Sequence, residues 1–390
     1  MARRVALLDA VAVLAIFLGT RAVQLLIVAW MAGPDPVSVK DRLLKWDGGW
    51  FVNVATQGYA HGYTYDPSGQ MNGNGLAFFP GYPMLIRGIS ALGLEARSAA
   101  LWAAWIAAGA ACLLLHRFGI ALRDRRLGFV LVTLYCGQPM SVVLGMGYSE
   151  GMFTALVVGA LLAAYRRHWL IAGVVGLAAA LTRPTGLAVA IALAVAAGMA
   201  VRERAAARLD ACAAAFMALL GVPAYILWVG ARVGHLDAWF RIQTAGWGTT
   251  TDWGRSTWEF LDTAVKRGDS WVQMSVALIL IAAVVSAAFS LRAPARADAP
   301  PARGWLRWLR GWTWPPLVVY GVLALGAVLG QAGYYHSKPR LLVPVLLTLI
   351  GPGFALARAR TGTAVAVLAG YSLFGLWYGA YMITIWPYTI

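Results

Sequence analysis

The residues best suited to chemistry lie in a polar and aromatic stretch at positions 45–51, which reads Lys-Trp-Asp-Gly-Gly-Trp-Phe. Asp47 stands between Trp46 and Trp50. In a cleft at a membrane edge, such a carboxylate suits a general base toward a sugar hydroxyl, or a ligand for a divalent cation. We predict that Asp47 is catalytic and that both tryptophans bind substrate. The alternative is a solvated loop aspartate or a helix cap.

A second carboxylate, Glu150, follows Tyr148 and Ser149 in a short polar break between two apolar segments. An ionisable side chain at the rim of a membrane bundle is functional by default when it faces inward. Ser149 could equally cap the next helix, whose dipole would favour a glutamate in the first turn. The two roles are compatible, and we predict that Glu150 orients an acceptor or helps to hold a divalent ion.

Basic side chains in two further breaks could bind a phosphate. Arg183 lies in the sequence Thr-Arg-Pro-Thr-Gly, where a planar guanidinium before a helix start suits an anion. Lys338 and Arg340 flank a proline and follow His336, which makes a cationic, aromatic edge suited to a phosphate group. We predict that all four bind substrate. The alternative is anchoring at the membrane interface.

These residues must be positioned by a membrane scaffold. The 390-residue chain is 60% hydrophobic and only 12% charged, whereas charged residues make up about a quarter of an ordinary soluble domain. Long apolar segments alternate with arginine clusters, as in polytopic helical membrane proteins. We predict an all-α fold in a single integral membrane domain over residues 1–390. The three cysteines show no metal-ligand spacing and are predicted to pack as thiols.

Eleven apolar segments are predicted to cross the bilayer, the first as an uncleaved N-terminal span. They lie near residues 6–31, 98–116, 127–146, 152–165, 169–182, 186–201, 210–230, 272–291, 313–331, 341–357 and 363–384. The apolar segment 78–93 is short and broken by Pro80 and Pro83, so we predict an interfacial or re-entrant helix there rather than a span.

The charge distribution predicts the orientation. With the N-terminus in the cytoplasm, the inside segments carry 18 of the 32 lysines and arginines, and the outside segments carry 11 of the 16 acidic residues. The net charge of +16 is then a topology signal toward anionic cytoplasmic lipid, not a nucleic-acid surface. Segments 33–97 and 231–271 become long extracytoplasmic loops. The basic aromatic stretch 303–312 is predicted to anchor at the inner interface.

Several motifs together resemble the PIG-V family of mannosyltransferases. They are Trp46-Asp47-x-x-Trp50-Phe51, Gln57-Gly58-Tyr59, Phe78-Phe79-Pro80-Gly81-Tyr82-Pro83, Gln138-Pro139 leading to Tyr148-Ser149-Glu150, and Arg183 before Gly186. In eukaryotes this family adds the second mannose during glycosylphosphatidylinositol anchor assembly. The alanine- and arginine-rich composition indicates a bacterial member. Trp50 and Gln57 stand where the family commonly has histidine, which leaves the acceptor and any metal open. Tyr82 joins the predicted substrate-binding residues.

The resemblance implies a GT-C fold, meaning a polytopic glycosyltransferase with an outer active site, a polyprenyl- or dolichyl-phosphate sugar donor and inversion at the anomeric carbon. It also gives Asp47 the role of catalytic carboxylate. We therefore predict a multi-pass cell-membrane enzyme that transfers a sugar, mannose by the resemblance, from a polyprenyl-phosphate donor to an extracytoplasmic lipid or glycan acceptor. No cofactor is predicted beyond the divalent cation considered above. The alternative is a transporter or flippase of a lipid-linked anionic substrate.

Overall fold

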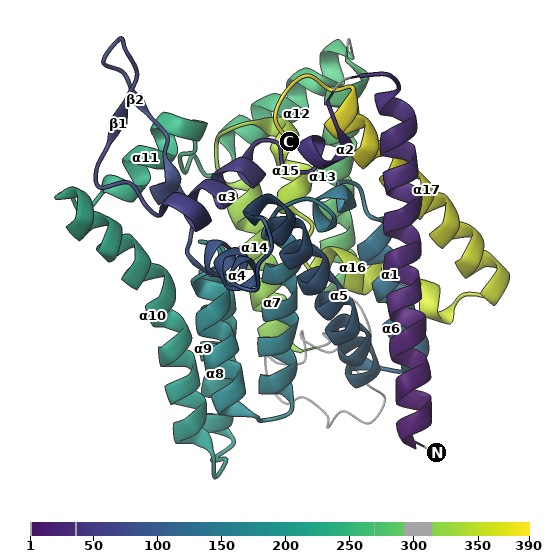
Figure 1. Cartoon of the computed structure of the whole chain (residues 1–390). Helices are drawn as coiled ribbons and strands as arrows, with labels where there is room; N and C mark the ends of the chain where they lie inside the picture. The colour runs from purple at the N-terminus through teal and green to yellow at the C-terminus, as the bar shows by residue number, and fades with distance from the viewer. Residues whose placement is uncertain (1, 36, 269, 292–313) are drawn as a thin grey trace.

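The structure is a computed structural model that describes residues 2–35, 37–268, 270–291 and 314–390. Nearly all of its regular elements are helices (Figure 1). The α-helices are α1 (Ala2–Ala32), α2 (Val39–Arg42), α3 (Asp47–Gln57), α4 (Gly81–Ser90), α5 (Ala96–Leu122), α6 (Arg125–Gly137), α7 (Glu150–Tyr165), α8 (Trp169–Ala180), α9 (Gly186–Arg202), α10 (Arg208–Val233), α11 (Ala238–Trp247), α12 (Arg255–Arg267), α13 (Trp271–Ser290), α14 (Pro315–Leu329), α15 (Lys338–Leu341), α16 (Leu347–Arg358) and α17 (Thr361–Thr384). The 3-10 helices are η1 (Gly75–Ala77), η2 (Ser141–Leu144) and η4 (Tyr335–Ser337), and β1 (Thr64–Tyr65) pairs antiparallel with β2 (Met71–Asn72). The predicted all-α fold is confirmed.

Five of these helices are long and apolar enough to cross a membrane, namely α1, α5, α10, α13 and α17. Five shorter apolar helices accompany them, namely α7, α8, α9, α14 and α16. The chain is therefore a multi-pass membrane protein. Each of the eleven predicted spans contains helix in the structure, although the number that cross the bilayer stays a prediction.

Two of the predicted spans are broken by proline. In the predicted span near 127–146, the α-helix α6 ends at Gly137, and after Pro139 the chain continues as η2. The one near 341–357 starts as the single turn of α15, and its main helix begins only after Pro344. Proline cannot donate the helical hydrogen bond and restricts the residue before it, which explains both breaks. The stretch 303–312, predicted as an inner anchor, lies outside the described residues.

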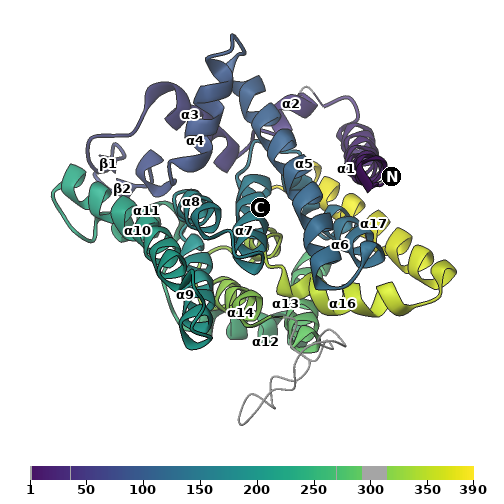
Figure 2. The same ribbon diagram turned by 90° about the horizontal axis from the view of Figure 1, so that it is seen from below.

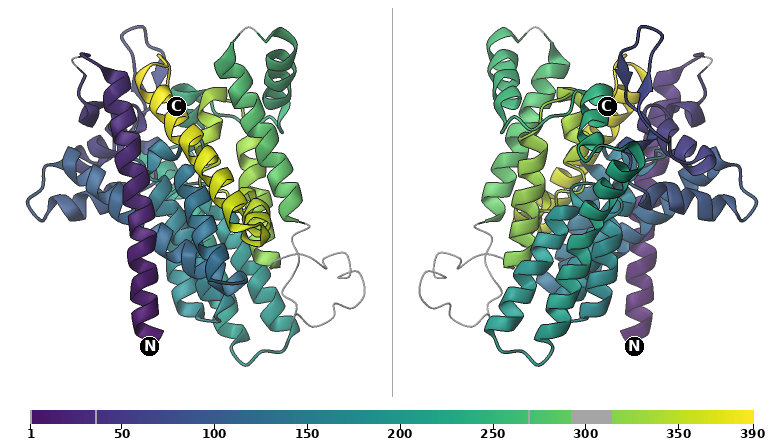
Figure 3. Two further views of the ribbon diagram at one scale, coloured as in Figure 1. Left: turned by 90° about the vertical axis from the view of Figure 1, so that its right-hand side faces the viewer. Right: turned by 90° about the vertical axis from the view of Figure 1, so that its left-hand side faces the viewer.

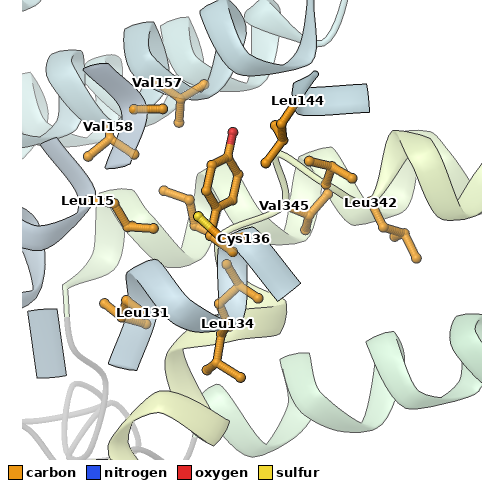
Figure 4. Packing of buried hydrophobic residues seen from close by; sticks show 14 of the residues in the cluster. Leu115, Leu131, Leu134, Cys136, Leu144, Val157, Val158, Leu342 and Val345 are labelled. Atoms are coloured by element: carbon orange, nitrogen blue, oxygen red, sulfur yellow. The ribbon is translucent and has the colours of Figure 1, made fainter. Parts of the chain in front are cut away.

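The centre of the bundle is α7, which lies between α5 and α8 (Figure 2). Its apolar side chains join the main hydrophobic core with residues of α5, α6, α13, α14 and α16. Figure 4 shows part of this core, in which Leu115, Leu131 and Val157 surround Cys136. An alanine-rich layer of α8, α9 and α10 packs beside it. Small residues let these helices approach closely, since a Cβ at Gly173 would lie 2.8 Å from Cα of Ala214.

The polar connections separate into two ends of the bundle. The β-hairpin, α2, α3, α11, α12 and the C-terminus lie at the upper end of Figure 1, and we call this the site end. The N-terminus and the turns joining α5 to α6, α7 to α8 and α9 to α10 lie at the opposite end, which we call the basic end (Figures 1 and 3). This separation agrees with the predicted topology, in which the long polar loops share one side of the membrane.

The segment 78–93 forms the ten-residue helix α4, packed against α3 and α5. Ten residues rise only ~15 Å, about half the thickness of the hydrocarbon core. That this segment is an interfacial or re-entrant helix stays a prediction, with which the length of α4 agrees. Its start is tied to the bundle, because the backbone N–H of Gly81 donates to the carbonyl oxygen of Leu181 at 2.8 Å. This contact brings the first long loop beside the break that contains Arg183.

Candidate active site

Asp47 is the first residue of α3, at the site end of the bundle. Trp46 before it has a φ of 54°, a value unusual for any residue with a side chain, and this conformation turns the chain into the helix. Oδ2 of Asp47 accepts a hydrogen bond of 2.5 Å from Nη1 of Arg340. Oδ1 makes no hydrogen bond within the described residues. The carboxylate is thus held by one oxygen and leaves the other available to a ligand.

Glu150 joins two arginines from distant parts of the chain. It begins α7, and its side chain is fully buried. Its Oε1 lies 2.8 Å from Nη1 of Arg183 and 3.7 Å from Nε of Arg340. Arg183 also donates to Oγ of Ser149 at 3.1 Å, so this serine binds the arginine and makes no side-chain cap of α7. Because Arg340 also holds Asp47, the residues Asp47, Glu150, Arg183 and Arg340 form one continuous cluster.

The charges within this cluster balance formally. Burial lowers the pKa of Arg340, but the carboxylates of Asp47 and Glu150 raise it by more, so the net shift is upward. The guanidinium carbon of Arg340 also lies 5.1 Å from the ring centroid of Tyr148. The hydroxyl of Tyr148 in turn donates to the carbonyl oxygen of Lys45 at 3.1 Å. Arg340 is therefore a permanently charged group in a fixed position.

A cavity of about 200 Å³ opens beside the cluster. Asp47, Arg183 and Arg340 line it, whereas the buried Glu150 contacts both arginines without reaching it. Aromatic and polar side chains complete the wall: Phe51, Phe78, Phe79, Trp239, Gln243, Trp247, Thr249, Gln331 and Tyr334. Guanidinium groups bind phosphate well, and aromatic faces pack on apolar C–H groups. The cavity therefore suits an anion next to a ring with an apolar face.

The β-hairpin holds α11 against this cavity. Gly73, just after β2, meets Gly246 of α11 so closely that a Cβ on Gly73 would lie 2.5 Å from Cα of Gly246 and 2.7 Å from the ring of Trp247. A side chain at Gly73 would therefore push α11 away. Trp247 then packs edge-to-face on Phe78, with ring centroids 5.3 Å apart. The two glycines thus set the position of an aromatic wall residue.

Lys338 lines the cavity, but its ammonium group is already bound by the protein. Nζ donates to Oγ1 of Thr257 at 2.9 Å and to the carbonyl oxygens of Val328 and Gln331 at 2.9 and 2.6 Å. These contacts use all three donors of an ammonium group. Lys338 thus ties α12 and α14 together at the cavity wall, and its predicted contact with a substrate phosphate stays a prediction.

His336, unlike Lys338, does not line the cavity. It is buried between Tyr334 and Tyr388, with ring centroids at 5.4 and 6.3 Å. Burial lowers the pKa of His336, which favours the neutral imidazole. The structure shows His336 packed among aromatic rings, and its predicted substrate contact stays a prediction.

The three predicted aromatic binding residues also lie outside the cavity lining. Tyr82 is fully buried, and its hydroxyl donates to the carbonyl oxygen of Ala100 at 2.7 Å. Trp50 stacks on the wall residue Phe78, with centroids 6.1 Å apart, and Trp46 packs against the main core. In the structure these side chains pack behind the residues that line the cavity, and their substrate contacts stay predictions.

Sequence reasoning missed Gln243 and Gln331 as cavity residues. Gln243 donates from Nε2 to the carbonyl oxygen of Ala77 at 3.0 Å, and Trp239 donates from Nε1 to the same oxygen at 3.3 Å. Gln243 lies on the short amphipathic helix α11, where the sequence pattern of a cavity glutamine is the same as that of an exposed polar residue. No local sequence signal distinguishes Gln243 from the polar residues beside it.

The charged cluster does not fit a divalent cation. Within the part of the chain that the structure describes, no three His, Cys, Asp or Glu side chains gather as metal ligands would. Arg340 already supplies positive charge between Asp47 and Glu150.

Cys112 and Cys136 are buried free thiols, with their sulfur atoms 3.5 Å apart in the core.

The protein is thus a helical membrane protein with a charged, aromatic-walled cavity at one end. Over 131 residues its sequence is 31% identical to GPI alpha-1,6-mannosyltransferase 2 from Cricetulus griseus, and equally similar to the Rattus norvegicus protein of that name. The match covers 30% of this chain and only 24% of each relative. The predicted resemblance to the PIG-V mannosyltransferases is confirmed over that part. No family model matches the chain.

Two solved structures are also similar to this chain over most of its length. ArnT from Cupriavidus metallidurans, bound to undecaprenyl phosphate, gives a TM-score of 0.49 with 16% identity, over 93% of this chain and 62% of ArnT. An oligosaccharyltransferase from Archaeoglobus fulgidus gives 0.46 with 13% identity, over 94% of this chain and 52% of that protein.

Proposed function

We propose that this protein is an inverting membrane glycosyltransferase of the GT-C type, which transfers mannose from a polyprenyl-phosphate donor to a lipid or glycan acceptor. The observation that carries the proposal is the convergence of Asp47, Arg183 and Arg340 on one cavity. The reaction needs a carboxylate to accept a proton and cations to stabilise a departing phosphate. The local similarity to a mannosyltransferase supports the choice of sugar.

A second, largely apolar cavity of about 320 Å³ supports a lipid-linked donor. It shares five lining residues with the charged cavity: Pro184, Trp239, Gln243, Thr249 and Gln331. From there it continues between α9 and α14, where Leu187, Ile191 and Leu323 form its wall. A phosphate bound by Arg183 would leave its hydrocarbon chain beside this apolar surface, where burial is favourable.

In the proposed reaction, Oδ1 of Asp47 accepts the proton of the acceptor hydroxyl as the hydroxyl oxygen attacks the anomeric carbon. The new C–O bond forms on the face opposite the phosphate. The bond between the anomeric carbon and the phosphate oxygen breaks, and its electron pair stays on the phosphate. The anomeric configuration is therefore inverted. Arg340 supports this step by holding Oδ2 of Asp47.

Arg183 and Arg340 stabilise the charge that develops on the departing phosphate. Both line the cavity, and Nη2 of each makes no hydrogen bond to another described residue. Removing one such preorganised donor costs about 3–4 kcal/mol of transition-state stabilisation in well-studied cases. Glu150 is a positioning residue, because it touches both guanidinium groups from the buried side.

We place the site on the extracytoplasmic face of the cell membrane, within a single membrane domain over residues 1–390. The arginine-rich turns lie at the basic end, and positive loops face the cytoplasm. Loops 33–97 and 231–271, which carry α3 and α11, then face outward. A transporter would need a polar path to both faces, whereas the charged cavity residues lie at the site end.

The test is sugar transfer in proteoliposomes supplied with polyprenyl-phosphate-mannose and a membrane lipid extract as acceptor source. Asp47→Asn is expected to lower turnover by about 100- to 10,000-fold. Asp262→Asn is the matched control, since Asp262 lies exposed on α12, where it pairs with the surface residue Lys266. Near-normal turnover in Asp47→Asn would remove Asp47 from catalysis. Movement of the donor across the bilayer without transfer would support a transporter instead.

A further inference from the structure

An apolar recess separate from the Asp47 cavities lies between α6 and α17. This α6–α17 groove has a volume of about 400 Å³. Its lining residues are Arg125, Arg126, Phe129, Val130, Thr133, Thr361, Ala364, Val365 and Leu368. The two helices pack side by side, as Figure 2 shows from below. We infer that the α6–α17 groove binds an anionic phospholipid, and this inference is independent of the proposed glycosyl transfer.

The floor of the groove follows the two helix axes. On α6 the lining residues 126, 129, 130 and 133 recur at helical spacing, and 361, 364, 365 and 368 do so on α17. From 126 to 133 the groove therefore extends ~10 Å along α6. Apart from two threonines, the side chains below the arginines are apolar. This shape accepts the first part of an acyl chain lying parallel to the helices.

The rim of the groove carries unbalanced positive charge. Arg126 donates from Nη2 to the carbonyl oxygen of Ala359 at 2.6 Å, which places it beside the turn between α16 and α17. Arg358 and Arg360 lie exposed in and beside that same turn. Among the described residues, none of these three arginines forms a salt bridge with an acidic side chain. Arg125 is different, because it pairs with Asp9.

A lipid fits this combination better than a soluble anion or an acidic peptide. The groove opens on a face of α17 whose apolar side chains are exposed, with Val365 at 60% and Val367 at 48%. In a membrane protein such a face meets hydrocarbon. A basic rim above an apolar recess between spanning helices selects an anionic head group with an acyl chain. The rim belongs to the basic end, which is predicted to face the anionic leaflet.

The experiment is native mass spectrometry of the purified full chain with equal amounts of phosphatidylglycerol and phosphatidylcholine. The wild type is expected to retain phosphatidylglycerol preferentially. Each arginine near a membrane surface contributes about a fivefold preference for an anionic lipid. Arg126→Gln combined with Arg360→Gln is therefore expected to lower the preference for phosphatidylglycerol by about 25-fold. Thr133→Phe, which fills the groove and keeps every arginine, should also abolish retention.

The matched control is Arg202→Gln combined with Arg208→Gln, two exposed arginines outside the groove. This pair removes the same charge and is expected to leave lipid retention unchanged. Equal retention of the two lipids by the wild type would overturn the inference. Equal losses in the two double variants would also overturn it, because they would indicate a diffuse charge effect. Thermal unfolding of each variant confirms that it is folded.

Discussion

Oε1 of Glu150 lies 2.8 Å from Nη1 of Arg183, although Glu150 is fully buried. A buried carboxylate is tolerated only when a cation compensates it. Here one carboxylate serves Arg183 and, at 3.7 Å, Arg340 as well. Because both arginines line the proposed phosphate site, Glu150 fixes the geometry of that site from the protein interior.

Glu150→Gln should therefore reduce both stability and turnover. Removing one partner of a buried ion pair typically costs about 3–5 kcal/mol, and both guanidinium groups would lose their fixed counter-charge. Thermal unfolding and transfer activity, measured in the same detergent, test this. Glu203→Gln is the matched control, because Glu203 pairs with Arg167 at 2.9 Å on an exposed surface where ion pairs contribute little. Equal destabilisation by the two changes would contradict this view of Glu150.

Arg340→Lys should retain the charge but lose the planar fork that reaches Asp47 and Glu150 together. We expect kcat to fall by about 100-fold or more, with kcat/KM falling in parallel because the lost interaction acts in the transition state. Arg255→Lys, which alters an exposed pair with Glu259 on α12, should behave like the wild type. A rise in KM with unchanged kcat would instead show that Arg340 binds the ground state.

Lys338 should make stability depend on pH. Burial lowers its pKa to about 8, against an opposing effect of Asp252. The unfolded chain holds this proton up to about pH 10.4. Between these values the unfolded state binds more protons than the folded state, so the contribution of Lys338 to stability rises with pH.

Lys338→Met lacks this titration. The free energy of unfolding of the wild type, relative to Lys338→Met, should therefore increase from pH 7.5 to pH 9.5. Chemical denaturation at the two pH values measures the difference. A difference that stays constant, or shrinks, across this window would show that the three hydrogen bonds of Lys338 keep its ammonium group protonated.

Gly73→Ala should disturb the aromatic wall without touching a charged residue. The added Cβ would lie 2.5 Å from Cα of Gly246, so α11 and Trp247 must move. We expect a stability loss of about 1–3 kcal/mol and weaker donor binding, seen as a raised KM. Gly62→Ala is the control in the same loop, where a Cβ would meet nothing within 4 Å. Equal kinetics of the two variants would argue against a role for the Gly73–Gly246 contact.

The helices could be read from the sequence because their causes are local. Apolar length, proline breaks and arginine-rich turns are properties of consecutive residues. The prolines at positions 80 and 83 indicated a short helix there, and α4 has only ten residues. The helix ends within two of the predicted spans were not predicted correctly. Pro139 and Pro344 interrupt the helices there, although the apolar composition is continuous across both prolines.

The charged site was also visible in the sequence, but only as separate residues. Asp47, Glu150, Arg183 and Arg340 each interrupt an apolar chain, where an ionisable group is costly and therefore informative. Their grouping was not visible, since 293 residues separate Asp47 from Arg340. No short-range pattern encodes which of the candidates will meet.

Tertiary packing determines which of the candidate residues lie together in the site. Lys338 and Arg340 share one motif, yet packing surrounds Lys338 with acceptors from α12 and α14 and brings Arg340 to two carboxylates. Tyr82 and Trp247 are both aromatic loop residues, yet one is sealed in the core and the other lines the cavity. Residue type determined what each side chain could bind. Its partner was decided by the fold, because burial and hydrogen bonding depend on neighbours that only the folded chain assembles.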